Sequence, residues 1–416
     1  MARTVIGFGT AALAVALAAP LAAQEAQDGG MQLTFGISQN LGIGRNPNLD
    51  PGGSDISPVA TTNLSLGYLT QTRNQRLAID LQGGLQLDDA GAELAAPRLS
   101  LGYARTAADA DLTISGAVQR TRVDSLRSLA DFTTADGTVI LPADLDTLTL
   151  DGNRTTAQIG AQVTWGKTDP AGYRLGASLA SVTYDGQAAT VEPDSQTLSL
   201  DGGVRLDITP VLRADLGLRY AIYDEDGSPR TDRVGGTLGL AFDRPVGALS
   251  ASLSADETDD GTRFGLQLGR TFALPGTALT LGAGVSFAPG GGTDLTGQLS
   301  YRYALPTGQI DLSASRGYAT ATDGTERRLT TAQASYGQQL TPLSSLQIGF
   351  GYAETRDDTG DTARTASLSA SQSFQLTPDW ALSAGVRSEL RDETGVARAH
   401  SETGFLSIGR TFTYRP

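Results

Sequence analysis

The sequence predicts an all-β chain that closes into a transmembrane, antiparallel up-and-down β-barrel of about 20 strands, with 18 strands as the alternative. Three observations predict this fold. Apolar and polar residues alternate along nearly every segment, prolines return at regular intervals in short turns, and longer acidic stretches separate those turns. Alternation with a period of two is typical of strands that have one apolar and one polar face.

The alternating segments carry Gly, Ser, Thr, Gln and scattered charge on the face opposite their apolar side chains. The stretch 212–220 places Leu212, Leu216 and Tyr220 on one face and Arg213 and Asp215 on the other. A soluble sandwich buries its apolar faces, whereas a membrane barrel turns them toward lipid and encloses water. The connections between strands distinguish these two possibilities.

Seven prolines recur about every 30 to 40 residues in short connecting stretches: Pro170, Pro210, Pro245, Pro275, Pro306, Pro342 and Pro378. Proline suits the second position of a turn and has no N–H to donate to a sheet ladder. With further turns near 70–76 and 105–111, nine turns join eighteen strands, and the two end strands bring the total to about 20. Long acidic stretches alternate with these turns. Short periplasmic turns opposite longer extracellular loops are typical of an outer-membrane barrel.

The N-terminal residues 1–23 have the pattern of a cleaved secretory signal peptide. Arg3 precedes an apolar run from Ala11 to Leu21, and small residues precede Gln24. We therefore expect a signal peptide over 1–23, a short lead-in over 24–31 and the barrel over 32–416. No other apolar run approaches the roughly 18 residues of a membrane helix, which excludes a helical membrane protein.

Composition narrows the function classes further. The chain has no cysteine, which excludes disulfides, thiolate metal sites, a cysteine nucleophile and a lipid anchor on cysteine. Its net charge of −14 argues against a nucleic-acid partner. We therefore predict neither a resident metal nor a cofactor.

The last segment, 406–414, alternates up to an aromatic end, with Leu406, Ile408, Phe412 and Tyr414 on one face. In this respect the chain resembles bacterial outer-membrane β-barrels, whose last strand usually ends in an aromatic residue read by the barrel assembly machinery. It departs from that pattern because Arg415 and Pro416 follow Tyr414. Over the whole mature chain the architecture is similar to porin-like barrels of alphaproteobacterial type.

This resemblance implies a location in the outer membrane of a Gram-negative bacterium, with both termini in the periplasm. The implied partners are outer-membrane lipid, lipopolysaccharide and the barrel assembly machinery.

The lumen face carries the candidate functional residues. We expect ten charged side chains to line the pore: Arg174, Arg205, Arg213, Arg219, Arg302, Arg387, Asp80, Asp201, Asp215 and Asp311. Opposed charges along a water-filled bore create a transverse field that can orient and select solutes. The alternative is structural, namely that these charges only pair between neighbouring strands.

The longest expected connection, 123–152, combines acids with apolar groups. Its constriction candidates are Asp131, Phe132, Asp136, Asp144 and Asp146. A long loop in a compact fold is usually functional or disordered. Either it folds into the barrel mouth and narrows the pore, or its ends pair as a hairpin that extends two strands above the membrane.

Catalysis is not expected. His400 is the only histidine and falls in the last predicted loop near Glu402, but no Gly-x-Ser-x-Gly elbow occurs. The acidic loops also lack the spacing of a defined calcium loop. We predict a passive porin-like channel for small hydrophilic solutes. The alternatives are a structural or surface-interaction barrel and, less favoured, an outer-membrane hydrolase.

Overall fold

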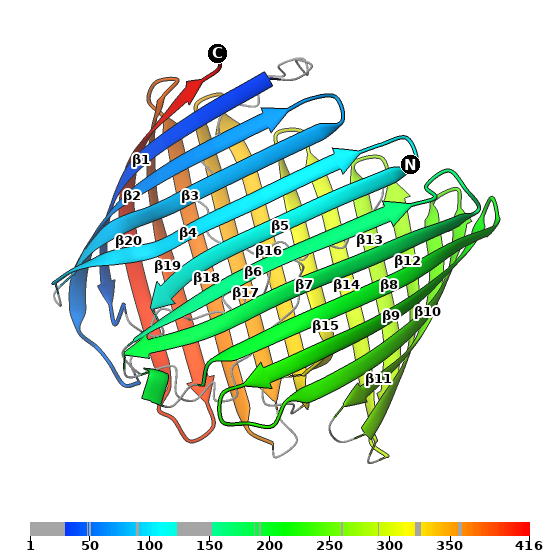
Figure 1. Cartoon of the computed structure of the whole chain (residues 1–416). Coiled ribbons are helices and arrows are strands. Elements are labelled where there is room, and N and C mark those ends of the chain that lie inside the picture. Colours follow the sequence, from blue (N-terminus) through cyan, green and yellow to red (C-terminus); the bar gives the residue numbers. More distant parts are fainter. Residues whose placement is uncertain are drawn as a thin grey trace.

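The computed structural model describes residues 30–47, 49, 51–88, 91–122, 152–186, 188–190, 193–258, 261–289, 291–320, 326–356 and 360–416. These residues form one closed antiparallel sheet of 20 strands (Figure 1). Each strand pairs with the next along the chain, and β1 pairs with β20 to close the ladder. The structure therefore confirms the predicted fold class and 20 strands rather than 18.

The strands tilt steeply across the barrel wall in Figure 1. Their bounds are β1 Gly30–Arg45, β2 Ile56–Gln71, β3 Gln75–Asp88, β4 Gly91–Thr106, β5 Ala110–Arg122, β6 Gly152–Trp165, β7 Ala171–Gly186, β8 Ser195–Thr209, β9 Leu212–Glu225, β10 Thr231–Arg244, β11 Gly247–Thr258, β12 Gly261–Leu274, β13 Thr277–Phe287, β14 Thr293–Leu305, β15 Gly308–Thr320, β16 Glu326–Thr341, β17 Ser344–Arg356, β18 Thr362–Gln375, β19 Trp380–Glu393 and β20 Ala399–Tyr414.

One short helical turn, the 3₁₀ segment η4 (Ala188–Thr190), lies between β7 and β8. In the part of the chain that the structure describes, no helix has the length and apolar character to cross a membrane.

All nine predicted turns connect consecutive strands at one end of the barrel, which we call the turn end. They comprise residues 72–74, 107–109, 166–170, 210–211, 245–246, 275–276, 306–307, 342–343 and 376–379. Gly30 and Tyr414 also lie there, because Leu33 of β1 pairs with Tyr414 of β20. We call the opposite end the loop end.

Two expectations about the connections and bounds need correction. The acidic stretches at the loop end are less loop-like than expected, because β9 continues to Glu225, which pairs with Ser195, and β11 continues to Thr258. The barrel begins at Gly30 rather than at residue 32, because Gly30 pairs with Gln71 of β2. Residues 1–29 and 123–151 lie outside the described residues, so the predicted signal peptide and long loop stay predictions.

One irregularity changes which residues of β4 face outward. Gln82 pairs with Arg98 and Gly84 pairs with Ala95, which leaves two residues of β4 opposite one of β3. This is a β-bulge at Ala96 and Pro97, and Ala96 has a φ of 37°. Proline cannot donate to the ladder and is tolerated at a bulge. The bulge reverses the side-chain alternation along the rest of the strand.

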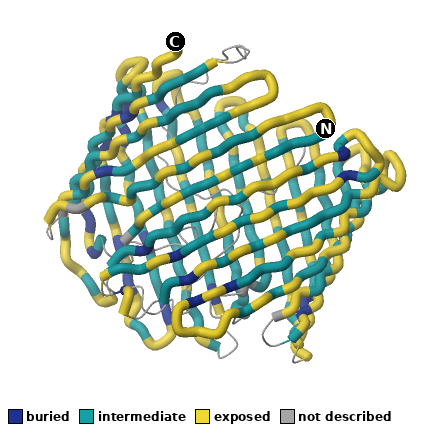
Figure 2. The backbone as a smooth tube through the Cα atoms, viewed as in Figure 1, coloured by how far each residue is buried: buried dark blue, intermediate teal, exposed yellow. Residues whose placement is uncertain are grey.

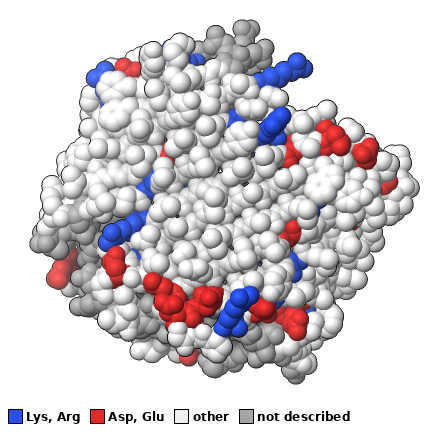
Figure 3. Space-filling model, in the orientation of Figure 1, with Lys and Arg blue, Asp and Glu red and all other residues white. Residues whose placement is uncertain are grey.

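The outer wall is apolar. Leucines, isoleucines, valines and aromatic residues on nearly every strand are exposed on one face, and the space-filling view shows a largely uncharged wall with charged groups gathered toward the margins (Figure 3). Outward aromatic side chains lie in contact near the turn end, as in Phe35 with Phe412 and Trp165 with Tyr173, whose ring centroids are 6.1 and 5.5 Å apart. This is the arrangement of an apolar belt with an aromatic girdle at its margin.

Candidate functional site: the lumen wall

The alternation fixes which side chains point into the barrel. On β8, for example, Leu198 and Leu200 are exposed on the outer wall, while the alternating Ser199 and Asp201 are only half-exposed on the concave side. The same parity places the ten predicted pore-lining residues on the lumen face. Their role in lining a pore remains a proposal.

The densest group of lumen charges, six of the predicted residues together with Asp207, lies on β7, β8 and β9 toward the turn end. We call it the charged wall, and it comprises Arg174, Asp201, Arg205, Asp207, Arg213, Asp215 and Arg219. The register places Arg205 opposite Asp215, Asp207 opposite Arg213, and Asp201 opposite Arg219. Positive and negative groups therefore alternate both along each strand and between neighbouring strands.

Ion pairs connect the members of the charged wall. Arg174 Nε lies 3.7 Å from Asp201 Oδ2, and Arg213 Nε lies 3.1 Å from Asp215 Oδ2. The four side chains of these two pairs remain 41–52% exposed. Exposed pairs of this kind contribute at most about 1 kcal/mol to folding, so their charges remain accessible to a solute.

Glycines on the lumen face let the charged side chains lie along the wall. A Cβ added to Gly176 would meet the Asp201 carboxylate at 2.2 Å, and one added to Gly203 would meet the Arg174 guanidinium at 3.3 Å. The side chains of Asp201 and Arg174 therefore lie over the backbone of the neighbouring strand. The arrangement keeps both charges close to the wall.

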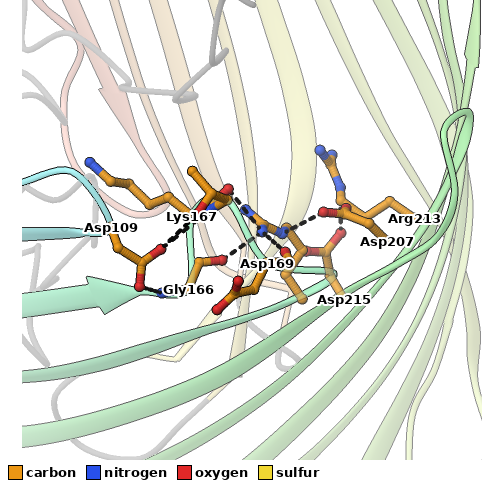
Figure 4. A network of polar contacts seen from close by, with 9 residues as sticks. Asp109, Gly166, Lys167, Asp169, Asp207, Arg213 and Asp215 are labelled. Carbon is orange, nitrogen blue, oxygen red and sulfur yellow. Dashed lines mark hydrogen bonds and ion pairs between the residues drawn. The ribbon is translucent and has the colours of Figure 1, made fainter.

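A hydrogen-bond network fixes one end of the charged wall to the turns (Figure 4). Arg205 Nη2 donates to the carbonyl oxygens of Gly166, Lys167 and Asp169 at 2.9, 3.3 and 3.0 Å, and Arg205 Nε lies 3.2 Å from Asp207. Arg205 thus joins β8 to the β6–β7 turn.

The same turn is held to the β4–β5 turn by Asp109 and by the only lysine of the chain. The Asp109 carboxylate accepts hydrogen bonds from the backbone N–H groups of Gly166 and Thr168. The Lys167 ammonium donates to the Ala107 carbonyl and to Asp111, both at 2.9 Å. The backbone N–H of Thr168, foremost among these contacts, lowers the pKa of the Asp109 carboxyl.

The other predicted lumen residues are dispersed around the barrel. Arg302 of β14 and Asp311 of β15 form a 2.7 Å pair near the turn end, and Arg387 of β19 pairs with Glu389 at 3.1 Å. Asp80 of β3 lies beside Gly67 of β2. The five constriction candidates, Asp131, Phe132, Asp136, Asp144 and Asp146, lie outside the described residues.

The loop half of the lumen contains charged residues that the sequence reasoning did not select. Arg154 is 5% and Arg263 8% exposed, and the side chains of the paired Arg391 and Glu393 are 14% and 5% exposed. Ser401 of β20 is only 1% exposed. Protein atoms therefore cover these five side chains. Figure 2 shows buried stretches near this end of the barrel.

A cluster at the loop end spans five consecutive strands. The Arg263 guanidinium of β12 stacks 3.8 Å from the Tyr318 ring centroid of β15, and Arg263 donates to Ser286 of β13. Asp294 of β14 lies 3.9 Å from Arg328 of β16. Because Tyr318 reaches a residue three strands away, the ladder alone would not predict this contact.

His400 is not in a loop, as the sequence suggested, but is the second residue of β20, where it pairs with Leu390. Its Nε2 lies 3.1 Å from Ser388 Oγ and 3.9 Å from Glu402. Both contacts involve the same ring nitrogen, whereas a catalytic triad needs the acid on the other nitrogen. No group of three or more metal-ligating side chains suited to an ion occurs among the described residues.

No protein-family model and no curated protein matches the chain. Solved structures do match. The ferric enterobactin receptor PfeA of Pseudomonas aeruginosa, as its G324V mutant, aligns with a TM-score of 0.53 and 10% identity over 94% of this chain and 81% of the receptor. The FrpB iron transporter of Neisseria meningitidis aligns with a TM-score of 0.50 and 8% identity, covering 94% and 82% of the two chains.

OpdQ of Pseudomonas aeruginosa is a more distant match in shape, with a TM-score of 0.41 and 13% identity over 92% of this chain and 99% of OpdQ. At identities this low, the likeness to PfeA and FrpB establishes the fold alone. The chain folds as an outer-membrane type β-barrel.

Proposed function

We propose that this protein is an outer-membrane channel for passive diffusion of small hydrophilic solutes. The observation that carries the proposal is a closed 20-stranded barrel whose lumen wall presents exposed, paired charges while its outer wall is apolar. Barrels of 16–18 strands already enclose an aqueous channel. A 20-stranded barrel is wide enough for solutes unless its lumen is filled.

The proposed location is the outer membrane of a Gram-negative bacterium, as in porin-like barrels of alphaproteobacterial type. In this orientation the turn end, with both strand termini, faces the periplasm, because outer-membrane barrels have short periplasmic turns. The aromatic girdle near the turn end then lies at the inner headgroup level. Lipid, lipopolysaccharide and the barrel assembly machinery are the partners that this location implies.

Planar-bilayer recording of the refolded protein tests the channel. We expect discrete conductance steps and no enzymatic turnover. A folded barrel is recognised by heat-modifiable migration on gels, since its closed ladder has no free edge. Protein that passes this folding test and still conducts no ions would overturn the channel and favour a structural or surface-interaction barrel.

The Ser388–His400 contact supplies the specific observation for testing the hydrolase alternative. The pair lies on the outer face near the loop end, and its geometry lacks the acid on the second ring nitrogen. We therefore expect no ester hydrolysis of mixed phospholipid vesicles by the wild type. Hydrolysis that disappears in the His400→Gln variant, with conductance retained, would establish the enzyme instead.

A further inference from the structure

The charged wall differs from the lumen surface that faces it. In a closed ladder of 20 strands, β8 lies half a circumference from β18. The lumen face of β18 carries four successive serines, Ser367, Ser369, Ser371 and Ser373. Ser373 hydrogen-bonds to Ser345 of β17 at 2.7 Å, so the neutral surface continues onto the next strand.

The charges of the charged wall nearly cancel one another, since it has four arginines and three aspartates. At a distance such a surface has a weak net potential, and it enriches neither small cations nor small anions. Close to the wall the field is strong and alternates in sign between neighbouring side chains. A solute with a single charge is therefore attracted at one position and repelled at the next.

We propose that the charged wall is a binding and selection surface for zwitterionic solutes, such as amino acids and short peptides, that carry an ammonium and a carboxylate group. An ammonium group binds Asp215 or Asp201 while the carboxylate binds Arg213 or Arg174, and both ends of the solute are satisfied together. The half-exposed pairs offer their unused hydrogen-bonding positions to the lumen. The serine surface on β18 accepts the uncharged part of the solute.

The wall is preorganised for this role. Asp201 and Arg174 lie over glycines of the neighbouring strands, and Arg205 is held by three turn carbonyls. Fixed charges lose little conformational entropy when a solute binds. The surface can therefore discriminate between solutes while each contact stays weak enough for release.

This inference rests on the proposed channel, so its test must separate failure of the channel from failure of the selectivity. Liposome swelling with four solutes of similar size does so: glycylglycine as the zwitterion, N-acetylglycinamide as the neutral solute, N-acetylglycinate as the anion and glycylglycinamide as the cation. We expect glycylglycine to enter about three-fold faster than the neutral solute, because exposed charge contacts are individually weak.

The decisive variant is the double substitution Arg213→Gln with Asp215→Asn, which removes one exposed pair and keeps the net charge. We expect the glycylglycine to N-acetylglycinamide ratio to fall to about one, consistent with the loss of weak contacts. Because a ratio is independent of how many barrels assemble, poor folding does not obscure the result. The matched control is Arg230→Gln with Asp232→Asn, a pair at 3.3 Å at the loop end of the outer face, which should leave the ratio unchanged.

Three outcomes would contradict the proposals, and they differ. Swelling with none of the solutes by a heat-modifiable barrel overturns the channel itself. Equal swelling rates for zwitterion and neutral solute in the wild type overturn the selection surface and leave the channel intact. A preference that persists in the double variant places selectivity elsewhere and removes the assignment to the charged wall.

Discussion

The two halves of the lumen carry the same kinds of ion pair in opposite surroundings. In the turn half, Arg213 and Asp215 are 48% and 52% exposed, whereas in the loop half Arg391 and Glu393 are 14% and 5% exposed. In each pair an arginine stands two residues before an acid on the same strand, so residue type does not explain the difference in exposure. The surroundings of the two pairs explain it, because protein atoms cover Arg391 and Glu393 and leave Arg213 and Asp215 half-exposed.

In the channel that we propose, this difference gives the two pairs separate roles. Half-exposed charges such as Arg213 and Asp215 cost little to hold and remain available to solutes. Charges in the covered half must satisfy one another, because a buried ion without a partner is costly. The Arg391–Glu393 pair of β19 is such a case.

Removing one acid from each half should produce the largest contrast. Glu393→Gln removes a carboxylate that is only 5% exposed and pairs with Arg391, and it should lower the free energy of unfolding by about 3 kcal/mol. Asp215→Asn removes an exposed partner and should cost at most about 1 kcal/mol. Urea unfolding of the barrel in lipid vesicles, followed by tryptophan fluorescence, measures both. Equal losses would mean that the two halves are equally hydrated.

An arginine introduced on the outer wall gives a reference value for these losses of stability. Leu253 and Ser252 are neighbours on β11 with opposite faces, and Leu253 is exposed on the apolar wall. Leu253→Arg should destabilise the barrel by roughly 2–4 kcal/mol, as expected for arginine facing lipid near the midplane, whereas Ser252→Arg faces the lumen and should cost much less. The same unfolding measurement applies, and a reversed order would show that the faces have been misassigned.

Much of this architecture follows from local sequence. The alternation in segments such as 212–220 predicts which side chains face outward, because side chains of a strand alternate strictly. The prolines and polar turns predict all nine turn-end connections. The assignment of side chains to the outer or the lumen face fails where an extra residue enters the ladder, as at Ala96 in β4. The segment "AAPRLS" does not reveal whether the chain forms a one-residue bulge or a longer loop at that point.

The site was less predictable, for a physical reason. Pairs such as Arg213–Asp215 are local and can be expected from spacing, but the cover over Glu393 and the contact of Arg263 with Tyr318 join residues far apart in the sequence. Burial depends on what crosses the bore, and periodicity carries no information about that. The Ser388–His400 contact was missed similarly, because it depends on the register of β19 against β20.

Cysteine labelling sharpens the comparison of the two halves directly, because the chain has no native cysteine. Ser300 of β14 is an exposed lumen residue in the turn half, and Ser401 is the most buried serine of the loop half. A water-soluble maleimide should label Ser300→Cys at least about ten-fold faster than Ser401→Cys, since thiol reactivity follows exposure. Similar rates for the two variants would mean that water reaches both halves equally.

The smallest expected effect concerns the turns that support the open half. The backbone N–H of Thr168, followed by other hydrogen bonds from the β6–β7 turn, lowers the pKa of Asp109 below its ordinary value of 3.8. Because the folded protein binds this proton less readily than the unfolded chain, the stabilisation is present above about pH 4 and is lost as the pH falls through the lowered pKa. The wild type should therefore lose slightly more stability between about pH 5 and pH 3 than Asp109→Asn, which cannot titrate there. Asp169→Asn in the same turn is the matched control, because only its backbone carbonyl joins the network through Arg205. If Asp169→Asn flattens the acid response as much as Asp109→Asn does, the hydrogen bonds to Asp109 are not what holds the two turns together.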